Sequence, residues 1–361
     1  MDVIHSVDYL LNADIRRKTR LNFERQQVSK ALLNLKWKHH IQMGCEQTGR
    51  GHREDICALD IDDGDEMIIL ASYGGSITVT RYKNLLGKKW KKSMKISLEE
   101  KPLKTIDWCP IDLRLFMLTS SSGWMRVCDV TMEREIQSSQ FDGEIHSDWN
   151  EYNTRSSRIA VADGSALAKI IDFRVGMGLP QVVRWEDQPI DVVQWYPSKQ
   201  HYLYAGRRDG SIGVFDIRST QTPIAYKRVH NSRMYELRIS SDGLRIISAD
   251  RDGYIHLSDT WDFSNKALHR NREMTERPFL EVMEGDRDLF VATNCRNLSV
   301  LRFKKESLFP EVDEQLAVSL RNVPFKFRKS SLELITGSNR NYLNILSFDG
   351  SSDSEQEEDE L

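Results

Sequence analysis

Short runs of alternating apolar and polar residues recur along the chain with a nearly constant spacing. Four of them read WMRVCDV, LAKIIDF, SIGVFDI and YIHLSDT, and a shared aspartate recurs in them every 43 or 44 residues, at Asp129, Asp172, Asp216 and Asp259. Weaker copies extend the series to seven, with Arg81, Arg302 and Ser347 in the corresponding place. Alternation with period two is typical of half-buried strands. The pattern therefore predicts seven copies of one β unit.

Each copy has the same internal order, which residues 190–216 show clearly. A strand ends at Tyr196-Pro197, a second runs to Ala205, and Asp209-Gly210 forms a tight turn before the third strand. Units of 40–45 residues built from short strands are typical of WD-repeat propellers. We expect an all-β chain: a seven-bladed WD40-type β-propeller with an N-terminal amphipathic helical segment and a disordered acidic C-terminal tail. A β-sandwich or two small β domains would not keep the spacing constant.

The positions of the seven repeats also predict a closing strand, two loops and one structural hydrogen bond. The stretch LNLKWKHHI, residues 33–41, alternates and is expected to complete the last blade, while 83–101 and 264–278 are expected to be polar surface loops. No unit contains the Trp-Asp pair; Phe215 precedes Asp216 in the best copy. His230 and Asp252 are expected to share a structural hydrogen bond across a blade.

The two ends of the chain differ from the repeats. Between residues 8 and 35, Leu21, Val28, Leu32 and Leu35 fall at helical spacing, which predicts an amphipathic helix or a pair of helices, packed on its own ring or held by a partner. The tail 349–361 holds seven acidic residues and no Lys or Arg, too much charge to fold. We therefore divide the chain into 1–36, an N-terminal helical segment, 37–348, the propeller, and 349–361, a disordered acidic tail.

Composition narrows the function classes. Hydrophobic residues make up 39% and charged residues 29%, as in soluble globular proteins, and the net charge is −3. No run of 18 apolar residues or secretory signal is present, so we expect no membrane association. The five cysteines are scattered, form no CxxC pair and suit a reducing compartment.

The chain lacks recognisable catalytic chemistry. It contains no GxSxG, P-loop or HExxH motif, and its nine histidines show no metal-ligand spacing. We expect no enzyme activity, no metal and no cofactor, and a binding function instead. The lysine cluster GKKWKKSMK, residues 87–95, could contact phosphates, but one short loop offers few contacts, so we expect no direct nucleic-acid binding.

Two consecutive units carry an Asp-x-Arg box that the repeat itself does not require. The boxes are Asp172-Phe173-Arg174 and Asp216-Ile217-Arg218, and none of the other five units has Arg at this place. In an extended strand, residues i and i+2 point to the same side. The planar guanidinium fork suits protein recognition. We expect the two arginines on one rim of the ring.

An Asp-x-Arg box on two consecutive blades resembles the signature of WD-repeat substrate receptors of cullin-RING ubiquitin ligases. Four further features are similar to those of the Cockayne syndrome group A type: the arginine-rich helical segment, ICALDI at 56–61, strands ending in DWCP or QWYP, and the acidic tail. The resemblance implies a nuclear, non-catalytic receptor. It would dock on the large damage-specific DNA-binding adaptor and act in transcription-coupled nucleotide excision repair.

The resemblance also implies partners and contact residues. The partners would be the adaptor, the cullin-RING complex, a Cockayne syndrome group B-type repair ATPase and stalled RNA polymerase II. The adaptor-binding residues would be Asp172, Arg174, Asp216, Arg218, Leu21, Val28 and Leu32. The opposite face would recruit substrate, with candidates Trp149, Arg207, Arg208, Arg233 and Arg251. The alternative is a WD-repeat scaffold in another nuclear complex, handling chromatin or RNA, without a ligase adaptor.

Overall fold

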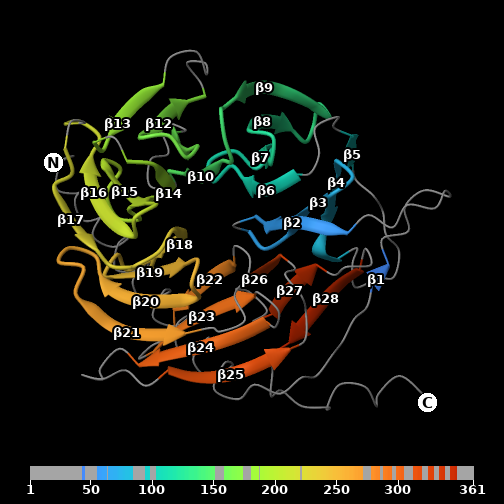
Figure 1. The fold of residues 1–361 in the computed structure, drawn as a ribbon. Helices are drawn as coiled ribbons and strands as arrows, with labels where there is room; N and C mark the ends of the chain where they lie inside the picture. Colours follow the sequence, from blue (N-terminus) through green and yellow to red (C-terminus); the bar gives the residue numbers. More distant parts are fainter. Residues whose placement is uncertain are drawn as a thin grey trace, which may run out of the picture.

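Seven antiparallel sheets of four strands each follow one another around a central axis (Figure 1). The computed structural model describes residues 43–44, 55–62, 64–83, 94–97, 103–150, 158–173, 180–186, 188–219, 222–270, 278–284, 288–294, 298–304, 312–318, 324–328, 333–337 and 342–347. The predicted seven-bladed β-propeller is confirmed. Every aspartate of the repeat series is the last residue of a third strand, so the spacing predicted the register of the blades.

The strands have the following bounds. Blade one comprises β2 (Ile56–Ile61), β3 (Met67–Ser72), β4 (Ser76–Arg81) and β5 (Met94–Ser97). Blade two comprises β6 (Leu103–Trp108), β7 (Leu115–Ser120), β8 (Trp124–Asp129) and β9 (Arg134–Gln140). Blade three comprises β10 (His146–Trp149), β11 (Arg158–Ala162), β12 (Leu167–Asp172) and β13 (Gln181–Arg184). Blade four comprises β14 (Ile190–Trp195), β15 (Tyr202–Arg207), β16 (Ser211–Asp216) and β17 (Ala225–Arg228).

The remaining blades follow the same order. Blade five comprises β18 (Met234–Ile239), β19 (Arg245–Asp250), β20 (Tyr254–Asp259) and β21 (Asn265–Arg270). Blade six comprises β22 (Phe279–Glu284), β23 (Asp288–Asn294), β24 (Leu298–Lys304) and β25 (Val312–Val318). Blade seven comprises β26 (Phe325–Arg328), β27 (Glu333–Gly337), β28 (Tyr342–Ser347) and, from the start of the chain, β1 (Met43–Gly44).

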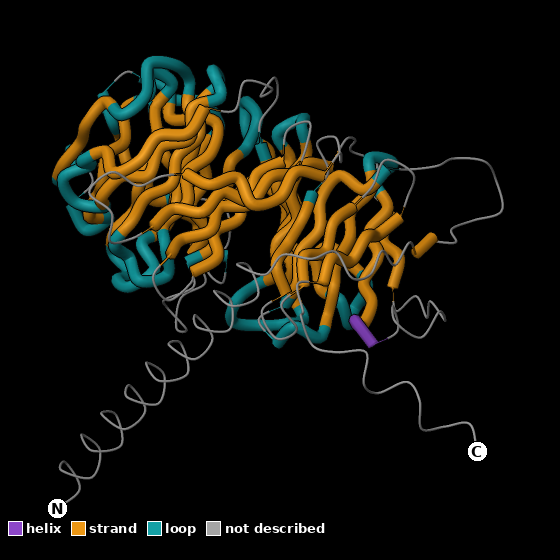
Figure 2. Tube along the Cα trace, turned by 90° about the horizontal axis from the view of Figure 1, so that it is seen from below, coloured by secondary structure: helices purple, strands orange, loops and turns teal. Residues whose placement is uncertain are grey.

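The first strand of each blade lies inside the ring and the fourth lies outside (Figure 1). Turns gather on the two sides of the ring when it is seen edge-on (Figure 2). We call the side with the turns between second and third strands the top face; the connections between blades lie there too. The side with the turns between first and second and between third and fourth strands is the bottom face.

Strand β1 closes the ring by pairing with the last strand of the repeat series. Met43 lies opposite Leu343 and Gly44 opposite Tyr342. An N-terminal strand was predicted for this place, but at 33–41. That stretch lies outside the described residues, and the pairing strand begins two residues after it.

The predicted loops at 83–101 and 264–278 each contain a fourth strand, so this prediction was wrong. They hold β5 and β21. A fourth strand pairs on one edge only and its outer side faces solvent. In β21 only Ala267 is buried, so no apolar alternation marks it in the sequence.

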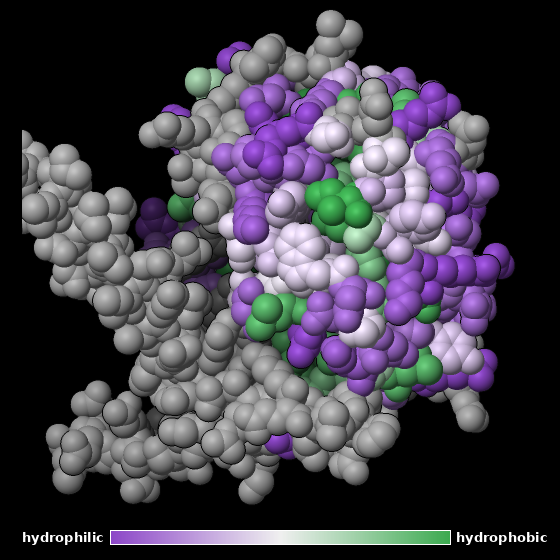
Figure 3. Space-filling view, turned by 90° about the vertical axis from the view of Figure 1, so that its left-hand side faces the viewer, coloured by the Kyte–Doolittle hydropathy of each residue, from purple (hydrophilic) through white to green (hydrophobic). Residues whose placement is uncertain are grey.

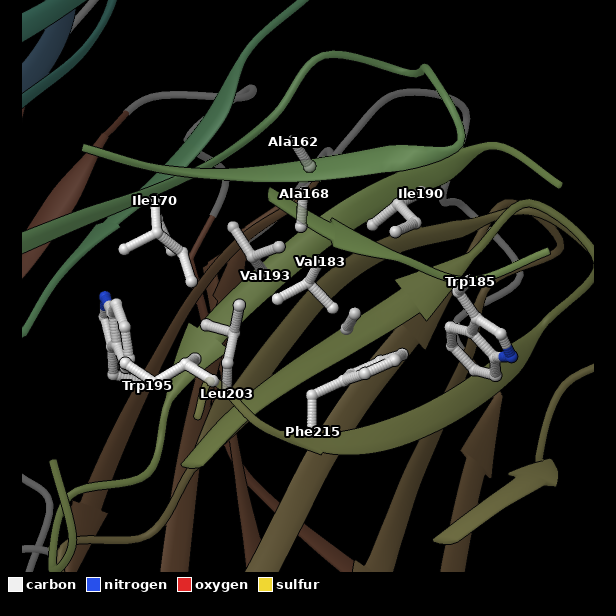
Figure 4. Close-up of a cluster of buried hydrophobic side chains, with 13 residues drawn as sticks. Ala162, Ala168, Ile170, Val183, Trp185, Ile190, Val193, Trp195, Leu203 and Phe215 are labelled. Atoms are coloured by element: carbon white, nitrogen blue, oxygen red, sulfur yellow. The ribbon is translucent and has the colours of Figure 1, made fainter. Parts of the chain in front are cut away.

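The hydrophobic core lies between neighbouring blades. One such cluster, between blades three and four, contains Trp185, Phe215 and Leu203 (Figure 4). Phe215 is fully buried, with its ring edge-to-face on Trp185 at 5.4 Å between centroids. It occupies the place just before the repeat aspartate, so this position serves packing. Close approach of the backbone to Trp185 requires Gly213, where a Cβ atom would lie 2.7 Å from the indole.

Charged side chains of the first strands connect neighbouring blades inside the ring. The Asp60 carboxylate accepts a hydrogen bond from the Trp108 backbone N–H at 2.7 Å, and Asp148 accepts one from Trp195 at 2.6 Å. Lys326 lies 3.2 Å from Asp60. Burial, reinforced by the Asp60 carboxylate, raises the pKa of Asp107 to about 7. The inner wall is therefore polar but extensively paired.

A buried polar network in blade five corrects one prediction. His230 Nε2 lies 2.7 Å from Ser248 Oγ, and its Nδ1 lies 3.1 Å from Asp250. Asp252, the predicted partner, is exposed in the following turn. The order Ser–His–Asp resembles a hydrolase triad, but these three side chains are fully buried and serve the fold.

Candidate docking surface on the bottom face

The aspartate that ends a third strand has a local structural task. Its carboxylate accepts the backbone N–H of the residue two positions later, at 2.6 Å for Asp129 and 3.0 Å for both Asp216 and Asp259. Such Asx turns reverse the chain toward the fourth strand. The aspartate is thus explained by the fold in three blades, without a partner.

The Arg218 side chain forms hydrogen bonds to Asp216 that the Asx turn does not require. Its Nε donates to Asp216 Oδ1 at 2.9 Å and its terminal nitrogen to Oδ2 at 2.6 Å. These hydrogen bonds lower the pKa of Asp216 to about 2. The Arg218 side chain is 62% exposed. Arg218 lies in the turn beyond β16, so the turn, not strand alternation, brings the pair together.

The structure describes only some of the other predicted adaptor-binding residues. Asp172 ends β12, and Phe173 packs edge-to-face on Trp149 with 5.5 Å between ring centroids. Arg174 lies outside the described residues. The same holds for Leu21, Val28 and Leu32, and for most of the lysine cluster 87–95. Their contribution to a docking surface stays a prediction.

Aromatic residues beside the Arg218 pair were missed at the sequence level. Tyr202 lies directly opposite Asp216 in the β15–β16 ladder, and its ring packs edge-to-face on Trp261 of blade five at 5.5 Å. Trp261 is 41% exposed. The ammonium of Lys199 lies over both rings, at 5.4 and 5.9 Å from the centroids. Trp261 stands two residues after Asp259, as Arg218 stands after Asp216, and this signal could have identified it.

Two further Asp–Arg pairs lie on the bottom face. Arg114 forms a two-point contact with Asp112, with 2.7 Å between its terminal nitrogen and Oδ2. The triplet Asp112-Leu113-Arg114 has the Asp-x-Arg spacing, but between a first and a second strand. In blade five, Arg245 lies 2.9 Å from Asp259. An arginine thus contacts an aspartate at the bottom of blades two, four and five.

We define the bottom-rim cluster as the side chains that meet at blades four and five: Lys199, Tyr202, Asp216, Arg218 and Trp261. Arg, Tyr and Trp are the residue types that most often dominate binding energy at protein interfaces. The cluster combines an exposed guanidinium that its own aspartate orients with two aromatic rings. This arrangement suits recognition of a folded partner surface and offers no nucleophile or general base in an enclosed pocket.

The predicted substrate-face residues divide into two groups. Arg208, Arg233 and Arg251 lie on the top face of blades four and five, on loops next to each other. Trp149 was wrongly placed: it ends a first strand, at the bottom side, and is buried. Arg207 is on the top side but is also buried, with its guanidinium 4.7 Å from the Trp185 ring centroid.

The outer side of blades four and five is mixed in character. Figure 3 shows apolar and weakly polar side chains among hydrophilic ones there. The large apolar side chains exposed on the outer strands of blades three to five and in the turn before β17 are Val182, Ile224, Tyr226 and Leu268. Single exposed apolar residues are normal on protein surfaces, so this side carries no strong docking signal.

Metal sites, membrane-spanning helices and reactive thiols are three other features that the described residues could form. Across the described ranges, no three His, Cys, Asp or Glu side chains come together as a metal site. Within those ranges no helix is long and apolar enough to cross a membrane. Cys57, Cys109 and Cys128 are buried, and burial raises the pKa of the Cys57 and Cys128 thiols to about 12. These thiols are poor nucleophiles.

Comparison with known sequences gives partial similarities. The chain matches no protein-family model. It is 25% identical over 121 residues to the nucleoporin Nup43 of Mus musculus, which covers 32% of this chain and 31% of that protein. The Homo sapiens Nup43 is 25% identical over 114 residues, 30% of this chain and 29% of that protein. The chain therefore spans less than a third of the length of these relatives.

Comparison with solved structures supports the architecture. The chain is similar to the β-propeller domain of Cps50 (Swd1) from Myceliophteria thermophila, with a TM-score of 0.65 and 12% identity. The similarity covers 86% of this chain and 99% of that domain. At this level of identity the likeness shows the fold alone. The protein is a seven-bladed β-propeller.

Proposed function

We propose that this propeller is the substrate receptor of a cullin-RING ubiquitin ligase and docks on the large damage-specific DNA-binding adaptor through its bottom face. The observation that carries the proposal is Arg218, exposed and held in a fixed orientation by Asp216. The Asp-x-Arg boxes and the resemblance described above name the adaptor. The receptor performs no chemistry itself.

Docking follows from the geometry of the bottom-rim cluster. Two hydrogen bonds from Arg218 to Asp216 fix the guanidinium before the partner arrives, so little side-chain entropy is lost on binding. Tyr202 and Trp261 provide apolar area beside it. Arg174, Leu21, Val28 and Leu32 would extend the contact toward blade three and the N-terminal segment.

The two faces then have separate tasks. The adaptor holds the bottom face, while a substrate occupies the top face, at Arg208, Arg233 and Arg251. A rigid ring between them keeps the substrate at a fixed distance from the ligase machinery. Transcription-coupled nucleotide excision repair in the nucleus, with the group B-type ATPase and stalled RNA polymerase II nearby, is the setting that the resemblance supports.

A second candidate is a WD-repeat scaffold in another nuclear complex, handling chromatin or RNA. The observation that favours it is the partial similarity to the nucleoporin Nup43. In this case the bottom-rim cluster would bind a partner other than the ligase adaptor.

A pull-down distinguishes the two candidates. The tagged chain, an Arg174→Ala/Arg218→Ala variant and a top-face control, Arg251→Ala, are expressed in cells and the adaptor is quantified. Loss of the adaptor in the double variant alone is expected. Equal recovery of the adaptor with all three chains, or no adaptor with any of them, would refute the ligase function. Other nuclear proteins recovered in its place would support the scaffold.

A further inference from the structure

Three arginines on the top face of blades four and five form a connected basic site, the top arginine cluster: Arg208, Arg233 and Arg251. Arg208 lies in the turn between β15 and β16, Arg233 in the connection before β18, and Arg251 in the turn after β19. The Arg251 backbone N–H donates to the Arg233 carbonyl at 2.8 Å. The three residues therefore come from neighbouring loops that are joined in space.

One buried aspartate orients two of these arginines. The terminal nitrogens of Arg208 and Arg233 both donate to Asp191 Oδ1, at 2.9 and 3.0 Å, and Arg208 Nε lies 3.3 Å from Oδ2. The Asp191 side chain is 2% exposed, while those of Arg208 and Arg233 are 48% and 37% exposed. A guanidinium has five N–H groups, so each keeps donors that face solvent.

The charges in this site do not balance. Arg208 and Arg233 share Asp191, which leaves one positive charge in excess at this pair, and Arg251 adds a third guanidinium beside the exposed Asp252. The hydrogen bonds to Asp191 raise the pKa of Arg208. Because the two guanidinium groups are already oriented, a carboxylate could form two parallel hydrogen bonds without ordering a flexible chain.

We propose that the top arginine cluster binds an acidic peptide segment, rich in Asp and Glu, of the substrate. This inference rests on the proposed receptor function and specifies the substrate class. The buried Asp191 contacts both Arg208 and Arg233, and the exposed Asp252 directly follows Arg251. The carboxylate of Asp252 would repel a continuous row of phosphates, whereas a peptide can place its acidic side chains at the arginines alone.

The test measures fluorescence anisotropy of a labelled dodecapeptide, GSSDSEQEEDEL, which is the acidic sequence of residues 350–361. The protein is the full chain with Asp and Glu of 349–361 replaced by Asn and Gln, so that its own tail does not compete. We compare this parent chain with Arg208→Gln/Arg233→Gln. The matched control is Arg114→Gln/Arg134→Gln, which removes the same charge from two exposed arginines at the bottom of blade two, outside the bottom-rim cluster.

We expect about tenfold weaker binding for the top-face variant than for the parent, and unchanged binding for the control. The top-face variant leaves the buried Asp191 without its two arginines and should melt at a lower temperature, so binding is measured well below the melting temperature of every chain. Binding should weaken with salt. A peptide with Asn and Gln in place of Asp and Glu should not bind. Equal affinity of the parent and the top-face variant, no binding to the parent, or displacement of the peptide by a lower concentration of single-stranded oligonucleotide would overturn the proposal.

The adaptor pull-down separates this proposal from the receptor function. Arg208→Gln/Arg233→Gln should recover as much adaptor as the parent. If peptide binding fails while the adaptor still depends on Arg218, only the substrate class is wrong. If the adaptor does not bind at all while the peptide does, the acidic-peptide site stands and the ligase setting is wrong.

Discussion

Replacement of Phe215 by alanine should strongly destabilise the propeller. The ring is fully buried between blades three and four and contacts Trp185 edge-to-face at 5.4 Å. An aromatic side chain buries about 150 Å² or more, which at ~25 cal/mol per Å² corresponds to ~4 kcal/mol. Because the backbone is held by β-ladders on both sides, the cavity cannot collapse fully. We expect the free energy of unfolding to fall by about 3–5 kcal/mol.

Tyr226 provides a matched control on the same indole. Its ring also lies edge-on to Trp185, at 5.9 Å, but it is 62% exposed. Tyr226→Ala should cost less than about 1 kcal/mol. Urea unfolding followed by tryptophan fluorescence and circular dichroism gives both values. A loss below about 1 kcal/mol for Phe215→Ala, or equal losses for the two variants, would refute the assignment of this position to core packing.

Three other predictions follow from single groups. Removing the Arg218 side chain by Arg218→Ala should raise the pKa of Asp216 from about 2 toward about 4, measured by NMR titration of that carboxyl; an unchanged pKa would show that the backbone N–H dominates. Asp107 has a raised pKa of about 7, so the fold gains stability below about pH 4 and loses it as the pH rises through 7. Denaturant midpoints from pH 5 to 8 should therefore fall less steeply for Asp107→Asn; parallel curves would contradict this. Gly213→Ala should cost about 1–3 kcal/mol in the same unfolding assay, because the new methyl group meets Trp185, and wild-type stability would argue against that contact.

The repeat frame could be predicted because the third strands have a constant sequence signature. An apolar alternation is followed by an aspartate that caps the turn, and both requirements are local. The fourth strands β5 and β21 escaped prediction because hydrogen bonding to β4 or β20 defines them, and in β21 only Ala267 is buried. Strand pairing of this kind leaves no apolar pattern in the sequence.

The site was predictable only where one turn contains both partners. Asp216 and Arg218 are two residues apart, whereas Tyr202 and Trp261 meet across two blades. The sequence also did not reveal which of the candidate side chains would be buried. Trp149 was expected on the surface because its type is common at interfaces, yet it fills the space between blades two and three.

The pairing of β1 with β28 means that the ring can close only after almost the whole chain has been synthesised. Gly44 leaves the ribosome about 300 residues before its partner Tyr342, an interval of roughly 15–60 s at typical rates of translation. Throughout it, the growing arc has an open strand edge that can pair with other chains. Newly made molecules should therefore depend on chaperones until the last blade emerges, and a premature stop codon before residue 342 would leave a ring that cannot close.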